Sequence, residues 1–179
     1  MLSEDALIES RRLFAIVGPP VSQAEIAMLF PTPFPGRDDL VQFYSNANGG
    51  SRTPQGCLIH CGNPAHKVSR DRLNEIRIEG FFSISRDPAD KMLPFAPMLG
   101  QYASTLNIFG QSPEVRAFLE QHKPIAFDHS GNDIWIDLQG GYLRFMDWDT
   151  YKDGPVEIAS SFQEFVTRFW VDAVLPELE

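Results

Sequence analysis

The stretch that decides the fold lies in the last third of the chain, Lys123–Phe165, and reads KPIAFDHSGNDIWIDLQGGYLRFMDWDTYKDGPVEIASSFQEF. It contains three short segments with the character of strands, then a helical segment, with turn residues at each junction. The predicted strands are Ile125–Phe127, Asn132–Leu138 and Tyr142–Met146. Gly140 and Gly141 supply the hairpin turn between the last two. A strand meander combined with helices indicates an α+β fold, with a mixed, mostly antiparallel sheet flanked by helices.

The middle strand of this meander alternates in polarity. Its apolar side chains, on one face, are Ile134, Ile136 and Leu138, and those on the other face are Asp133, Trp135 and Asp137. If helices cover only one face of the sheet, Trp135 projects towards solvent between two carboxylates, which is a good hot spot for a basic partner. If helices cover both faces, Trp135 is a core residue.

Helical segments with recognisable ends precede and follow the meander. The predicted helices are Ser3–Ile16, Gln23–Phe30, Leu40–Ala47, Ser69–Ile76, Pro113–Gln121 and a last one that begins after Ser160 or Ser161. The predicted N-caps and capping box are Ser22 with Glu25, Asp38 or Asp39, and Ser112. Asn48, Gly49 and Gly50 are expected to end the third helix, with glycines at positive φ.

The remaining segments are less regular. Short strands are expected at Cys57–His60 and Ile78–Ile84. The segment Arg86–Gly110 is rich in Pro, Met and Gly and is expected to be irregular, with Leu106–Phe109 extended. At 179 residues the chain is expected to form a single domain that covers residues 1–179.

The composition excludes several classes of protein. No apolar run approaches the ~18 residues of a membrane span, and the first residues, MLSEDALIESRRLF, lack the apolar region of a secretory signal. With two cysteines the chain is not a disulfide scaffold, so a reducing cytoplasm is the expected compartment. Neither a membrane nor a cofactor is expected as a partner.

Negative charge is concentrated near the C-terminus. Residues 1–127 hold 13 acidic and 12 Lys or Arg residues, a net of −1, whereas residues 128–179 hold 11 and 3, a net of −8. Such a balance argues against nucleic acid as a direct partner and favours a basic protein, which an acidic surface attracts. A solvated face that only aids solubility is the alternative. The candidate partner-binding residues are Asp128, Asp133, Trp135, Asp137, Asp147, Trp148, Asp149 and Asp153.

Metal and catalytic sites are weakly indicated. The closest set to a zinc site is Cys57, His60, Cys61 and His66, whose spacing puts adjacent ligands on opposite faces of a strand. The spacing of Asp147, Asp149 and Asp153 before Gly154 only loosely resembles a calcium loop. No serine or cysteine has the setting of an activated nucleophile. We therefore expect no metal, no cofactor and no enzymatic activity.

Five motifs, in order along the chain, resemble the SUKH superfamily, specifically its Smi/Knr-type family. They lie in Gly18–Ile26, Leu40–Gly50, Pro124–Leu138, Leu143–Asp147 and Ile158–Phe165. The segment Arg86–Gly110 and the tail after Trp170 match no motif. The resemblance implies an α+β fold without enzymatic activity. It also implies a bacterial immunity protein that neutralises a toxin domain, often a nuclease, encoded by a neighbouring gene, or a regulator of cell-wall synthesis as in fungi.

An alternative within this resemblance is a regulatory scaffold or a small-ligand module linked to cell-wall or glycan metabolism. In that case Trp135, Trp148 and Tyr142 would stack on a sugar or a peptide.

Overall fold

The computed structural model describes residues 14–52, 56–61, 75–85, 97–128 and 130–173, and all structural statements below concern these residues. The helices are α2 (Gln23–Leu29), α3 (Arg37–Asn46), α4 (Met98–Phe109), α5 (Pro113–Gln121) and α6 (Phe162–Thr167), with a short 3-10 helix η1 (Tyr151–Asp153). The strands are β1 (Phe14–Val17), β2 (Gly50–Arg52), β3 (Gly56–Cys61), β4 (Glu75–Phe81), β5 (His122–Asp128), β6 (Asp133–Asp137), β7 (Leu143–Met146), β8 (Val156–Ala159) and β9 (Phe169–Ala173).

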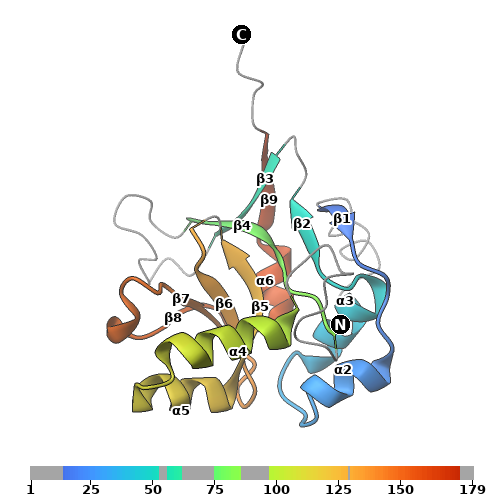
Figure 1. Ribbon diagram of the computed structural model, residues 1–179. Helices are drawn as coiled ribbons and strands as arrows, with labels where there is room; N and C mark the ends of the chain where they lie inside the picture. The colour runs from blue at the N-terminus through green and yellow to red at the C-terminus, as the bar shows by residue number, and fades with distance from the viewer. Residues whose placement is uncertain (1–13, 53–55, 62–74, 86–96, 129, 174–179) are drawn as a thin grey trace.

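The strands form one twisted sheet (Figure 1). Its order is β1-β2-β4-β5-β6-β7-β8, and β3 lies between β4 and β9 off this path. Every strand pair among the described residues is antiparallel, and an isolated bridge between Ser83 and Pro97 is parallel. The predicted α+β class, with a mostly antiparallel sheet flanked by helices, is therefore confirmed.

Helices cover the central strand β6 on both faces. Ile134 and Ile136 belong to the larger core, which the sheet forms with α2, α3 and α6. Trp135 points the other way into a second cluster with Val115 and Leu119 of α5. Figure 1 shows α4 and α5 together along the meander strands. Because alternate side chains of a strand point to opposite faces, one strand contributes to two separate cores.

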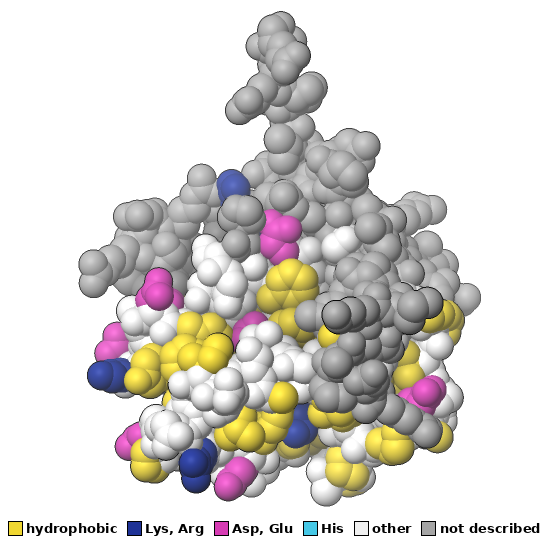
Figure 2. Space-filling view, viewed as in Figure 1, with side chains coloured by type: hydrophobic (Ala, Val, Ile, Leu, Met, Phe, Trp, Pro, Cys, Tyr) yellow, Lys and Arg dark blue, Asp and Glu magenta, His cyan; other side chains and the backbone are white. Residues whose placement is uncertain are grey.

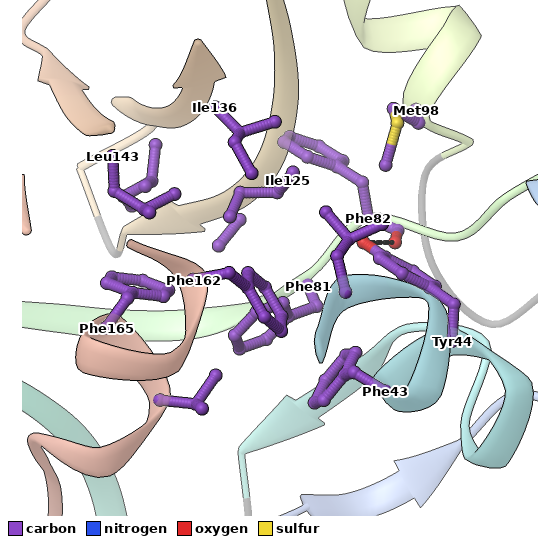
Figure 3. Close-up of a cluster of buried hydrophobic side chains, with 14 of the residues drawn as sticks. Phe43, Tyr44, Phe81, Phe82, Met98, Ile125, Ile136, Leu143, Phe162 and Phe165 are labelled. Carbon is purple, nitrogen blue, oxygen red and sulfur yellow. Dashed lines mark hydrogen bonds between the residues drawn. The ribbon is translucent and has the colours of Figure 1, made fainter. Parts of the chain in front are cut away.

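Aromatic rings dominate the larger core (Figure 3). The Phe43 ring of α3 lies 4.9 Å from that of Phe81 on β4 and 5.4 Å from that of Phe162 on α6. The Tyr44 hydroxyl donates to the carbonyl of Phe82 at 3.0 Å, and burial raises the pKa of this phenol well above its usual range. Each fully buried side chain of this size contributes roughly 1.5–3 kcal/mol, so this cluster fixes the position of α3 and α6 on the sheet.

Local capping signals predicted several elements correctly. Ser22 and Glu25 form the capping box of α2, and Ser112 caps α5, which ends at Gln121 as expected. The choice between Ser160 and Ser161 is resolved, since the Ser161 hydroxyl accepts from the amide of Glu164. Each of these serine hydroxyls accepts from the backbone amide three residues later. Because the contact is so local, the sequence pattern was sufficient to predict where these helices begin.

Four expectations were wrong. Phe14–Ile16 lie in β1 and not in a helix, while the rest of Ser3–Ile16 lies outside the described residues. Glu75 and Ile76 begin β4, and the first part of Ser69–Ile76 is outside the described residues as well. Met98–Phe109 forms the helix α4 within the segment Arg86–Gly110, which was expected to be irregular with Leu106–Phe109 extended. Gly36, at φ 80°, is the N-cap of α3 in place of Asp38 or Asp39. The short apolar runs at Phe14–Ile16 and Ile76 fit both periodicities, and pairing with neighbouring strands decided these two cases.

Asn48 joins the turn after α3 to the chain that leaves β4. Its side-chain amide donates to the carbonyl of Ile84 at 2.9 Å, and its oxygen accepts from the amide of Ile84 at 2.6 Å. Gly49 follows at φ 76°, where an added Cβ would stand 2.8 Å from the carbonyl oxygen of Phe81. The predicted structural role of the segment is confirmed for Asn48 and Gly49, but Gly50 is the first residue of β2 and has no positive φ, and α3 ends earlier, at Asn46.

Among the residues described, no helix is both long and apolar enough to cross a lipid bilayer.

We predict that Asn48→Ala destabilises the fold by about 2–5 kcal/mol, because it leaves a buried amide and a buried carbonyl of Ile84 without partners. Urea unfolding followed by circular dichroism measures the change. Asn107→Ala, at an exposed position of α4, is the matched control and should shift stability by no more than about 0.5 kcal/mol. Equal unfolding midpoints for Asn48→Ala and wild type would contradict the assignment.

Candidate functional site

The most acidic exposed segment of the described chain is the connection between β7 and β8, residues 147–155, which we call the acidic loop. Asp149 and Asp153 are exposed, and Asp147 and Trp148 are partly buried. Within the described chain neither exposed carboxylate makes an ion pair. Figure 2 shows acidic side chains beside a hydrophobic patch at the left of the molecule, where Figure 1 places this loop.

A buried carboxylate fixes the beginning of the acidic loop. Asp133, at the start of β6, is only 1% exposed. Its Oδ2 accepts from the indole Nε1 of Trp148 at 2.8 Å and from the side-chain amide of Gln101 on α4, also at 2.8 Å. The backbone amide of Trp148 in turn donates to Oδ1 of Asn132 at 3.1 Å. Both the side chain and the backbone of Trp148 are therefore held by residues at the start of β6.

Burial raises the pKa of Asp133 to about 6, against the opposing effect of the hydrogen bonds from Trp148 and Gln101. The carboxylate of Asp128 adds to the increase through its like charge. At neutral pH Asp133 is mainly ionised, which strengthens both hydrogen bonds, since charge-assisted bonds are stronger than neutral ones. Asp133 thus titrates close to physiological pH, as buried functional carboxylates often do.

Aromatic rings connect the acidic loop to the helices. The Trp148 indole stacks on Phe109 of α4 with ring centroids 4.6 Å apart and planes 12° apart. Phe109 also contacts Tyr151 of η1 at 5.2 Å, and Trp135 meets Trp148 edge to face at 6.2 Å. The loop is therefore held by stacking as well as by the Asp133 hydrogen bonds.

A cavity of about 600 Å³ opens between the acidic loop and α5. Phe118 and Val115 of α5 and Met146 of β7 give it an apolar lining. The charged side chains around it are Glu114, Lys152 and Asp153. A hydrogen bond from Ser112 lowers the pKa of Glu114, so this carboxyl is ionised at neutral pH. An aromatic wall next to two carboxylates suits a basic side chain of a partner.

Two of the predicted acidic residues serve the turns of the meander. Asp128 Oδ1 accepts from the amides of Ser130 and Asn132 in the turn between β5 and β6. Asp137 Oδ1 accepts from the amides of Gln139 and Gly140 in the next turn. Burial alone would raise the pKa of Asp137, but these amide bonds, with His122 and Arg144, lower it overall.

The structure thus separates the predicted site residues into two groups. Asp133, Asp147, Trp148, Asp149 and Asp153 lie together at the end of β6 nearest the acidic loop, and Asp128 is close enough to Asp133 to affect its pKa. Asp137 lies at the opposite end of β6, beside Arg144 at 3.6 Å and His122 at 3.8 Å.

Trp135 is fully buried under α5, so the expectation of an exposed hot spot is wrong and the alternative of a core residue is confirmed. The reason is that helices cover both faces of the sheet. Trp135, Trp148 and Tyr142, which were considered as a stacking site for a sugar, do not form one exposed surface. Tyr142 and Trp148 flank opposite ends of β7, and Trp135 is buried. Trp148 is moreover already stacked on Phe109.

No group of three or more potential metal ligands occurs in the part of the chain that the structure describes. In the acidic loop, Asp147 Oδ1 accepts from the amide of Asp149, as in a turn. Of the zinc candidates, Cys57, His60 and Cys61 lie in β3, and His66 falls outside the described residues.

Several residues of the site are absent from the sequence-based prediction. Glu114 and Phe118 come from α5, and Gln101 and Phe109 come from α4, both remote in sequence from the acidic loop. Tyr151 could have been predicted from the sequence, since it lies between Asp149 and Asp153 in a segment selected for its charge.

Comparison with known protein families gives one match. The SMI1 / KNR4 family (SUKH-1) matches the chain over residues 24–168, which is more than half of its length. No curated protein and no solved structure gave a match. The chain belongs to the SMI1/KNR4 (SUKH-1) family, and the predicted family resemblance is confirmed.

The pKa of Asp133 predicts a specific pH dependence of stability. A carboxyl whose pKa is higher in the folded than in the unfolded chain binds its proton more tightly when folded. It therefore contributes stability that is fully present below about pH 4 and is lost as pH rises through about 6. A shift from 3.8 to about 6 corresponds to about 3 kcal/mol.

We expect the stability of wild type relative to Asp133→Asn to fall by up to about 3 kcal/mol between pH 4 and 7, because asparagine does not titrate. Urea unfolding at a series of pH values measures it. Asp149→Asn leaves Asp133 in place and should retain the wild-type pH dependence. Parallel curves for wild type and Asp133→Asn would show that Asp133 does not titrate in this range.

Proposed function

We propose that this member of the SMI1/KNR4 family is a non-enzymatic, cytoplasmic protein-binding module that neutralises a basic toxin domain encoded by a neighbouring gene. The observation that carries the proposal is the exposed acidic loop, which stands over a cavity lined by aromatic rings and carboxylates. Membership of a family that includes immunity proteins supports this choice among protein-binding functions.

The charge distribution supports a basic partner. The C-terminal third of the chain holds nearly all of the net charge of −9, and two of its carboxylates, Asp149 and Asp153, are exposed in one short loop. Carboxylates so placed raise the local concentration of a basic partner and accelerate its association. If the toxin is a nuclease, its nucleic-acid site is basic, and the acidic loop would occupy it in place of phosphates.

The contacts of the acidic loop suit recognition by a preformed surface. Trp148 is anchored by hydrogen bonds to the edge of β6 and by stacking on α4. A loop fixed in this way loses little conformational entropy when a partner binds, which favours affinity. A lysine or arginine of the partner would extend between Phe118 and Tyr151 towards Glu114 and Asp153 in the cavity.

We predict that Asp153→Asn slows association with the basic partner about two- to tenfold at low salt, because it removes an exposed carboxylate at the cavity. Stopped-flow or surface plasmon resonance measures the rate. Asp38→Asn is the matched control, since Asp38 is also an exposed carboxylate but lies on α3, on the other side of the sheet. Equal effects of the two substitutions would move the interface away from the acidic loop.

The partner itself is identified by a pull-down with the products of the neighbouring genes, carried out at low and at high salt. The proposal expects a complex with a basic domain whose association slows strongly as salt increases. Failure to bind any neighbouring product, or association rates that do not depend on salt, would overturn it.

A further inference from the structure

We propose that Asp133 is a positioning residue for the acidic loop: its buried carboxylate holds the indole of Trp148 and thereby sets the conformation in which Asp149 and Asp153 are presented. We call the three side chains that meet there, Asp133, Trp148 and Gln101, the carboxylate clip. The role of the clip in binding rests on the function proposed above, whereas its effect on the loop does not.

The geometry makes the clip a junction of three elements. Asp133 Oδ2 belongs to β6, Gln101 to α4 and Trp148 to the acidic loop, and both donors stand 2.8 Å from the same oxygen. The stack of Trp148 on Phe109 holds the indole against α4 at the same time. Because the indole has a single N–H donor, Asp133 accepts the one hydrogen bond that its ring can make, and this bond adds to the stacking in orienting it.

The backbone of the loop is coupled to the clip through Trp148. The backbone amide of this residue donates to the side chain of Asn132, which directly precedes β6, so indole and backbone are fixed to two adjacent residues at the start of that strand. The next amide, that of Asp149, donates to Asp147 Oδ1. An indole released from Asp133 would free the first residues of the loop and change where the exposed carboxylates point.

The clip is expected to respond to pH. Burial raises the pKa of Asp133 to about 6, and protonation replaces two charge-assisted hydrogen bonds by weaker ones. Among the charged groups around it, Asp128 of β5 raises the pKa further, while the groups that face it from α4 and the loop are the uncharged Gln101 and Trp148. The hydrogen bond that the indole of Trp148 donates therefore changes in strength as Asp133 titrates, and the indole N–H reports this change.

The test is an NMR titration of the isolated, ¹⁵N-labelled protein between pH 5 and 8. The indole N–H signal of Trp148, assigned from its loss in Trp148→Phe, should shift with a midpoint near pH 6 in wild type and in the control Asp149→Asn. In Asp133→Asn the signal should not titrate. A Trp148 signal that is constant over this range in wild type, or that still titrates in Asp133→Asn, would overturn the clip.

Hydrogen exchange of the backbone amide of Trp148 tests the effect on the loop. We expect the protection of this amide at pH 7.5 to fall about tenfold or more in Asp133→Asn. The substitution weakens the hydrogen bond that holds the indole, and the backbone of residue 148 then opens more often. Trp148→Phe keeps an aromatic ring against Phe109 but removes the donor, and should show the same loss. Unchanged protection in both variants would overturn the positioning role.

These measurements need no partner, so their failure is separate from failure of the proposed function. If a basic partner binds and the loop is unaffected by both substitutions, the proposed function stands and the inference fails. If the clip titrates as expected and no neighbouring product binds, the clip stands and its assignment to binding is overturned.

Discussion

Burial of β6 on both faces is the constraint on which the rest of the structure depends. All five residues of this strand are buried, including two carboxylates and a tryptophan. An ionised carboxylate inside a protein needs hydrogen-bond donors, and each end of β6 meets this need differently. Asp137 finds them in the backbone of its own turn, whereas Asp133 draws on α4 and the acidic loop. The requirement to satisfy Asp133 thus links the core to the candidate binding surface.

The parts of the fold that follow from local signals were predictable. The strands of the meander, the capping box of α2, the N-cap of α5 and the α+β class rest on patterns within a few residues, and the structure confirms them. The charge and partial exposure of the acidic loop were also predictable, since Asp147, Asp149 and Asp153 are concentrated in one short segment of the sequence. Local sequence was sufficient for these elements, because their deciding contacts are local, but it misplaced the N-cap of α3.

The parts that could not be predicted depend on which elements meet. Whether Trp135 was a hot spot or a core residue depended on α5, about 20 residues earlier in the sequence, and periodicity alone cannot place a helix on a particular face of a sheet. The strand β1 and the helical character of Leu106–Phe109 were missed for the same reason. The role of Asp133 was hidden because its two donors, Gln101 and Trp148, are distant in sequence and come together only in the fold.

The Asn48–Gly49 pair has a further consequence for the chemical ageing of the protein. An asparagine followed by glycine is prone to deamidation, in which the glycine nitrogen attacks the side-chain carbonyl and ammonia leaves through a succinimide. In the fold both ends of the Asn48 amide are engaged by Ile84, and the nitrogen of Gly49 donates to Ala47. The native state therefore protects this bond, whereas an unfolded chain does not. A chain that deamidates before it folds would carry a carboxylate at position 48, which cannot donate to the carbonyl of Ile84. Slow folding would therefore produce a fraction of molecules that permanently lack this hydrogen bond.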